Sequence, residues 1–396
     1  MNKDRMVVIV SKAIIWSIYI FALGIFTSKF LIYLGMGFSL IFWLVKIGIL
    51  RKDYKFIKTE YLIPILLFSA SIFISGIGNW NNEILENKFF YSFIFFFIII
   101  NEISSYKELK KILCTMIFSA VIASFYGLYQ HFYLNMRRVE SFSFSLSWGN
   151  FTAVLSIFIL IYIIWSDVSK KIKILLGLFE LVLLVNLIFT QSRGAWLGFL
   201  TALVILGFLK GKKFLFISLI IILVIFMFLP NNYTSRFMSS FDIEYDLKTN
   251  RSNSVRIALW HTSLEMLKDN PINGVGYDNY RDAYLKQYKV KGVRAFGHAH
   301  NNLLNFAAEM GILGLSSFIY LMYIILKKLI IYYKSEEKLE LKLFHFGSIF
   351  LFVIYHVQGL TQYNFGDTET LYLFFFVIAL NVIIHNNLTG VVFNEN

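Results

Sequence analysis

The chain is 396 residues long, 58% hydrophobic and only 15% charged, and Phe alone occurs 43 times. So few charged residues exclude a soluble protein of this size, because they cannot cover its surface. The net charge of +13 comes from 37 Lys and Arg against 24 Asp and Glu. In so apolar a chain, the excess of basic residues indicates how the protein is oriented in the membrane. No nucleic-acid partner is expected.

Twelve apolar blocks are long enough to form membrane-spanning helices, which need about 20 residues each. They lie at residues 7–26, 30–50, 60–78, 88–102, 112–130, 150–166, 174–190, 195–210, 214–230, 301–326, 343–359 and 370–385. No small-residue cleavage site follows the first block, which predicts a retained span and not a removed signal peptide. The sequence therefore predicts an all-α polytopic membrane protein with about 12 transmembrane helices.

Spans one to nine are expected in residues 1–230 and spans ten to twelve in 300–396, separated by a large outer-face loop at 231–299. Placing the N-terminus inside assigns 20 Lys and Arg residues to the inner connections and termini and five to the short outer ones. Basic residues are enriched in cytoplasmic loops. We therefore expect a protein of the cytoplasmic membrane with both termini in the cytoplasm and residues 231–299 outside.

The outer loop contains a predicted helix. Val255, Leu259, Thr262, Met266 and Leu267 recur at helical spacing before Asn270-Pro271 ends the run. The loop is too short for a core of its own, so it is expected to rest on the ends of the spans. Its acidic run, Asp242, Glu244 and Asp246, is interpreted as a solvated loop and not as a cation site.

Polar residues from distant segments are predicted to meet at the outer face. The candidate catalytic residues are Arg193, Arg256 and His300, and the candidate binding residues are Arg137, Arg138, Ser192, Trp260, His298 and Asn301. Guanidinium groups bind phosphate through paired hydrogen bonds, and a histidine can accept the proton of an attacking hydroxyl. This combination suits a lipid diphosphate, whose tail lies in the bilayer and whose charges lie at its surface.

Each residue also has a structural interpretation. Arg193 can anchor the end of a span, Arg256 can belong to a solvated helix face, and Trp260 can be an interface anchor. Glu180, inside the seventh span, is expected to serve packing. No Cys/His spacing predicts a zinc site, and no glycine-rich nucleotide loop follows a strand. No metal ion or other cofactor is therefore expected.

Four motifs follow one another between residues 190 and 314. They are TQSRGAWLGF at 190–199, Arg256 with Trp260, P-x-x-G-x-G at 271–276, and AHNNLLNFAAEMGILG at 299–314. Their order and spacing resemble the O-antigen ligase and polymerase superfamily. The sharpest of them is His300-Asn301, followed after nine residues by Gly311 and Gly314.

The resemblance implies a GT-C-like membrane glycosyltransferase that works outside the membrane without metal or ATP. It implies an undecaprenyl-diphosphate-linked glycan as the donor. The acceptor would be a lipid-anchored or free glycan, such as the lipid A core oligosaccharide in lipopolysaccharide biosynthesis. Arg193 and Arg256 would bind the diphosphate, and His300 would activate or orient the acceptor hydroxyl. A polysaccharide polymerase of the same superfamily is the first alternative, and a transporter or flippase of lipid-linked sugars is the second.

Overall fold

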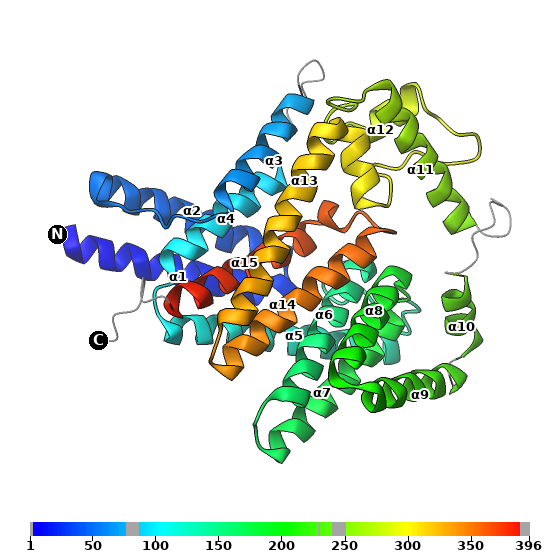
Figure 1. Ribbon diagram of the computed structural model, residues 1–396, viewed down its shortest axis with the longest axis horizontal. Coiled ribbons are helices and arrows are strands. Elements are labelled where there is room, and N and C mark those ends of the chain that lie inside the picture. The colour runs from blue at the N-terminus through cyan, green and yellow to red at the C-terminus, as the bar shows by residue number, and fades with distance from the viewer. Residues whose placement is uncertain (1–2, 77–86, 229, 240–250, 389–396) are drawn as a thin grey trace.

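The computed structural model describes residues 3–76, 87–228, 230–239 and 251–388, and these ranges are helical without a strand (Figure 1). The first nine helices are α1 (Lys3–Thr27), α2 (Lys29–Leu50), α3 (Leu62–Ser75), α4 (Lys88–Glu102), α5 (Tyr106–Phe132), α6 (Ser145–Trp165), α7 (Lys170–Phe189), α8 (Arg193–Lys210) and α9 (Lys212–Phe228). They are followed by α10 (Asn231–Met238), α11 (Arg251–Asp269), α12 (Tyr280–Lys286), α13 (Asn302–Ser335), α14 (Leu339–Gly359) and α15 (Thr368–Leu388). The described residues also form two short 3-10 helices, η1 (Arg51–Asp53) and η3 (Asn364–Gly366).

Every predicted span coincides with a helix, and the prediction of an all-α polytopic membrane protein is confirmed. Within the described ranges, nine helices are long and apolar enough to cross a membrane. The helices at the third, fourth and ninth predicted spans, α3, α4 and α9, are shorter, with 14, 15 and 17 residues. The number twelve therefore stays a prediction.

Serine and asparagine caps allow the helices to follow one another closely. The Ser28 hydroxyl accepts the backbone N–H of Leu31, so α2 begins two residues after α1 ends. Ser105 and Ser169 cap α5 and α7 in the same way. Such caps satisfy backbone donors that a helix leaves open at its first turn. Short connections between antiparallel neighbours follow from them.

Helix α15 forms the centre of the bundle. It contacts α1, α4, α6, α13 and α14, and nearly all its described side chains are buried. By contrast, most of the apolar stretches of α2 and α7 are not buried inside the protein. A polar contact ties α7 to its neighbours, because the Asn186 side chain accepts from the Trp148 indole of α6 and donates to the Ser124 carbonyl of α5.

The segment between α9 and α13 has a small core of its own. Side chains of α11 and α12 form a second hydrophobic cluster, whose members include Leu259, Met266, Tyr280 and Tyr284. The expectation that this loop is too short for a core is therefore wrong, because tyrosines outside the recognised helical pattern complete the cluster. The predicted helix is confirmed as α11, which packs on α13 (Figure 1).

Two glycines with positive φ join this segment to the bundle. Gly274 (φ +68°) and Gly311 (φ +62°) lie where the two backbones touch, and Gly311 interrupts the helical geometry of α13. A Cβ on Gly311 would lie 2.4 Å from the carbonyl carbon of Ile272, and one on Gly274 would lie 2.3 Å from that of Glu309. Four backbone hydrogen bonds join residues 271–276 to residues 308–313. The N–H groups of Val275 and Gly276 donate to the carbonyls of Ala308 and Glu309. Those of Ile312 and Leu313 donate to the carbonyls of Pro271 and Ile272. The glycines of the P-x-x-G-x-G and G-x-x-G motifs at these positions are thus explained by close backbone packing.

Replacing Gly311 with Ala should destabilise the protein. A side chain at positive φ costs roughly 1–3 kcal/mol even before the clash with Ile272 is counted. We expect a lower midpoint of thermal unfolding in detergent for Gly311→Ala. Gly177→Ala on α7 is the matched control, because nothing lies within 4 Å of a Cβ there. Equal unfolding midpoints for the two variants would show that the backbone contact is not needed.

Candidate functional site

Four arginines from four segments form a cluster at one end of the bundle. Arg193 begins α8 and Arg256 lies on α11, while Arg236 lies on α10 and Arg138 on the connection between α5 and α6. Arg193 is only 8% exposed and donates to the carbonyl and hydroxyl oxygens of Ser239 at 2.8 and 3.1 Å, and to the Ser252 hydroxyl at 3.0 Å. We call Arg138, Arg193, Arg236 and Arg256 the arginine cluster.

The cluster concentrates positive charge away from water. Burial and, to a smaller extent, the charges of Arg236 and Arg138 together lower the pKa of Arg256 to about 10. The pKa values of Arg236 and Arg138 are also lowered, first by burial and then by a neighbouring arginine, although Glu140 opposes the shift at Arg138. Mutual repulsion of this kind is relieved when an anion binds between the groups.

The hydrogen-bonding capacity of the cluster is not used up by the protein. Within the described residues no carboxylate makes an ion pair with any of the four arginines. The buried Nε of Arg256 has no hydrogen-bond partner there. Buried charges are normally paired. An unpaired group of guanidiniums with free donors therefore has the properties of a polyanion site.

His300 lies just before α13 with its imidazole held in one orientation. Its Nδ1 donates to the Gln362 amide oxygen at 3.1 Å, which leaves Nε2 as the proton acceptor. The His300 backbone N–H donates to Nδ1 of His298 at 3.2 Å, and the two rings meet edge to face with centroids 4.2 Å apart. His300 also has a φ of +52°, a backbone conformation that non-glycine residues adopt mainly where the surroundings impose it.

The surroundings keep His300 neutral. Its pKa is lowered to about 4, chiefly by burial and further by the charges of Arg256 and Arg294, while the hydrogen bond to Gln362 opposes the shift. The pKa of His298 is lowered to about 3, chiefly by burial and to a smaller extent by His300, Lys88 and Arg256. Because Arg256 contributes to the lowered pKa of both histidines, we treat the arginine cluster and the histidine pair as one candidate site.

Amide side chains fix the turn that carries Gln362. Asn301 donates to the Leu360 carbonyl at 3.0 Å, and Asn302 donates to the Asn364 amide oxygen at 2.7 Å. Asn364 in turn donates to the carbonyl of Tyr355 in α14 at 2.8 Å. The turn after α14 is thereby docked on the first residues of α13, and this docking sets the position of Gln362 against His300.

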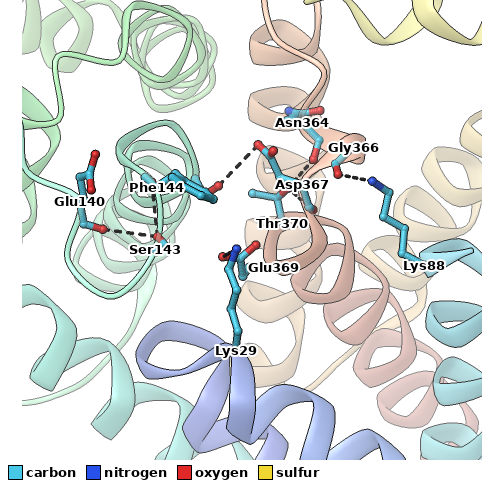
Figure 2. Close-up of polar contacts among 11 residues, drawn as sticks. Lys29, Lys88, Glu140, Ser143, Phe144, Asn364, Gly366, Asp367, Glu369 and Thr370 are labelled. Atoms are coloured by element: carbon cyan, nitrogen blue, oxygen red, sulfur yellow. Dashed lines mark hydrogen bonds and ion pairs between the residues drawn. The ribbon is translucent and has the colours of Figure 1, made fainter. Parts of the chain in front are cut away.

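A second polar cluster lies around the turn that leads into α15 (Figure 2). Lys88 donates to the Gly366 carbonyl and lies 5.9 Å from the Tyr363 ring centre, and Tyr363 also contacts His298. Lys29 pairs with Glu369 at 3.0 Å. The carboxyl group of Asp367 lies 3.5 Å from the Ser147 hydroxyl, and burial raises its pKa to about 7. Of these groups, Lys88 is close enough to His298 to contribute to the lowering of its pKa.

The structure places the other predicted residues differently. Arg137 is exposed at the rim, where its carbonyl accepts from Gln191. Ser192 is fully buried against Gly149 of α6. Asn301 caps α13, so both polar atoms of its side chain are engaged within the protein. Trp260 is half-buried on α11, and its indole nitrogen has no hydrogen-bond partner among the described residues.

Sequence reasoning missed Arg236 and gave Gln362 no role. Arg236 lies on an eight-residue helix with no recognisable spacing pattern, so only its approach to Arg193 and Arg256 reveals it. Gln362 lies in a turn 62 residues after its partner His300. Asp242, Glu244 and Asp246 lie outside the described residues. Among those that are described, no group of three or more His, Cys, Asp and Glu is arranged to hold a metal ion.

Comparison with known proteins identifies relatives of the chain. Residues 178–319, which contain Arg193, Arg256 and His300, match a family model described as O-antigen ligase. A Rickettsia typhi protein named "Putative polysaccharide ligase" is 26% identical over 87% of this chain and 82% of its own length. A Rickettsia felis protein of the same name is 28% identical over 80% and 78%, and an uncharacterized Haemophilus influenzae protein is 27% identical over 69% and 73%. The predicted resemblance to the O-antigen ligase superfamily is confirmed.

Replacing Gln362 with Glu should raise the pKa of His300. A carboxylate opposite the Nδ1–H group stabilises the imidazolium ion, and a neighbouring opposite charge typically shifts a pKa by about 1–3 units. Gln362→Ala is the control, because removal of the amide takes away a contact that raises the pKa and adds no charge. NMR titration of histidine-labelled protein, with His300 assigned from its missing signal in His300→Gln, measures both changes. An unchanged pKa in Gln362→Glu would contradict the hydrogen-bonded geometry.

Proposed function

We propose, from the similarity of this chain to the O-antigen ligase superfamily, that it transfers a glycan from undecaprenyl diphosphate to an acceptor hydroxyl. The reaction takes place at the outer face of the cytoplasmic membrane, with both termini of the chain in the cytoplasm. The acceptor is a surface glycan, such as the lipid A core oligosaccharide in a cell that makes lipopolysaccharide. The observation that carries the proposal is the arginine cluster, which lacks a carboxylate partner among the described residues and lies beside a neutral histidine.

The arginine cluster stabilises the leaving group. The acceptor oxygen forms a bond to the anomeric carbon while the bond between that carbon and the diphosphate oxygen breaks. The electron pair of the broken bond stays on undecaprenyl diphosphate, whose charge increases. Fixed guanidinium groups stabilise charge that develops in the transition state without having to reorganise. They supply the electrostatic assistance that other glycosyltransferases obtain from a metal ion, and the proposed reaction needs neither metal nor ATP.

His300 accepts the proton of the attacking acceptor hydroxyl. Because its pKa is about 4, the imidazole is neutral at physiological pH and its Nε2 lone pair is free to accept the acceptor proton. The imidazolium formed is a strong acid beside Arg256, so it passes the proton on to the departing diphosphate or to water. Gln362 holds the ring so that Nε2 keeps the same direction throughout the step. The geometry thus allows Nε2 to accept the proton, and the low pKa makes His300 a weak base that holds the proton only briefly.

A transfer assay with purified protein tests the proposal. With an undecaprenyl-diphosphate glycan and a defined acceptor, wild-type protein should form product without added metal or ATP. His300→Ala and Arg256→Ala should each lower the rate by about 100-fold or more, because general bases and charge stabilisation contribute factors of this size. Arg281→Ala on α12 is the control, because Arg281 is an exposed arginine of the same outer segment.

The products decide between the related activities. Product mass shows whether one glycan is transferred intact, as in a ligase, or a ladder of repeats is built, as in a polymerase. A transfer rate in His300→Ala and Arg256→Ala equal to that of Arg281→Ala would overturn the assignment of these residues. Transbilayer movement of the lipid without any product would favour the flippase alternative.

A further inference from the structure

A fully buried carboxyl group, that of Glu309, lies on α13, which α11 and α12 contact (Figure 1). Within the described residues Glu309 makes no ion pair. Burial and the charge of Asp278 oppose its ionisation, whereas the charge of Lys88 favours it. A buried acidic group is costly to keep, so the contacts of its two oxygens indicate why an acid stands at this position.

Three hydrogen-bond donors converge on the Glu309 carboxyl group. The side-chain amide of Asn305 donates to Oε2 at 3.0 Å. Hydrogen bonds from the backbone of Asp278 and Tyr280 also favour the ionised form of Glu309. An ionised carboxyl group only accepts hydrogen bonds, whereas an amide of the same shape carries an N–H2 group in place of one oxygen. Glutamine would therefore turn a donor toward one of these donors.

Asn305 connects Glu309 to the segment that carries the histidine pair. Its Nδ2 donates to Glu309, and its Oδ1 accepts the backbone N–H of Ala299 at 3.0 Å. Ala299 is the residue between His298 and His300. Glu309 thus fixes which end of the Asn305 amide faces the histidine segment, and that end holds the backbone between the two rings.

Glu309 is also linked to the helix that carries Arg256. The backbone of Tyr280 is hydrogen-bonded to Glu309, and the Tyr280 hydroxyl donates to the Leu259 carbonyl of α11 at 3.0 Å. Tyr280 is fully buried, and Leu259 lies three residues after Arg256 on the same helix. One acidic side chain therefore contacts the supports of both the arginine cluster and the histidine pair.

We propose that Glu309 is a positioning residue for the transfer reaction, an inference that rests on the function proposed above. Glu309 holds the Asn305 amide in one orientation and thereby sets the position of His300 relative to Arg256. It acts through Asn305 and the backbone of Ala299. A displacement of about 1 Å can lower the rate of an enzyme by about 100-fold, so a distant hydrogen bond of this kind can control the rate.

Exchanging the acid and the amide tests the proposal. In Glu309→Gln the new oxygen should face the backbone donors, which cannot reorient, so that its N–H2 group faces Asn305. Asn305 must then turn its own oxygen toward residue 309 and lose the hydrogen bond from Ala299. Asn305→Asp alone sets two carboxyl groups against each other. The double variant Asn305→Asp/Glu309→Gln again provides an acceptor for Ala299 and a donor–acceptor pair between positions 305 and 309.

Each single variant should lower kcat by about 10- to 100-fold, as loss of alignment does. The affinity for inorganic pyrophosphate should change little, because the arginine cluster keeps its own contacts. The double variant should recover about tenfold or more of the lost kcat, whereas losses that multiply in the double variant would overturn the proposal. Glu265→Gln is the control, because Glu265 is an exposed acid of α11, and it should behave as the wild type does.

Histidine NMR separates this inference from the proposed activity. The ring signals of His298 and His300, each assigned from its His→Gln variant, should shift in both single variants and return toward wild type in the double variant, even if no transfer is ever observed. A merely structural role would lower the midpoint of thermal unfolding without moving these signals. Wild-type signals in both single variants would overturn the proposal. If a single variant does not fold, a double variant that folds with wild-type signals supports it, and a double variant that does not fold overturns it.

Discussion

Repulsion among the four arginines of the cluster is the constraint on which the candidate site depends, with Arg193 buried and the other three half-buried. Positive charges held close together and away from water are costly unless an anion joins them. Hydrogen bonds to the protein hold the arginines in place despite this repulsion. Arg193 donates to Ser239 and Ser252, and Arg138 donates to the Thr190 carbonyl. A dianionic or trianionic group at the same place would turn the repulsion into binding. This is why we interpret the cluster as the diphosphate site.

Backbone contacts place the histidine pair close to the arginine cluster. The break in α13 at Gly311 lets the segment around Gly274 lie against the helix. This segment connects α11 to α12. Arg256 on α11 is therefore fixed relative to His300 at the start of α13. The amide contacts of Asn301 and Asn302 then fix the turn that carries Gln362. Changes in any of these backbone contacts should alter the distance between anion and imidazole.

Much of the fold could be predicted from the sequence because hydrophobic block length and helical spacing are local signals. These signals predict a helix at every span and at α11. The break at Gly311 and the core around Tyr280 and Tyr284 could not be predicted, because both depend on contacts between segments far apart. For the same reason the sequence does not single out Arg236, and it does not reveal that the Asn301 side chain caps α13. His300 and Arg193 can be proposed from the sequence because they lie in motifs and at the ends of spans, and their roles stay predictions.

Binding of inorganic pyrophosphate to the purified protein tests the role of the arginine cluster most directly. Isothermal titration at low and high salt should show binding that weakens with salt, and Arg236→Ala should weaken it by about tenfold or more, as loss of a charge-assisted contact does. Arg281→Ala, which removes an exposed arginine, should bind as the wild type does. Pyrophosphate affinity that is the same in Arg236→Ala, Arg256→Ala and the wild type would contradict the account.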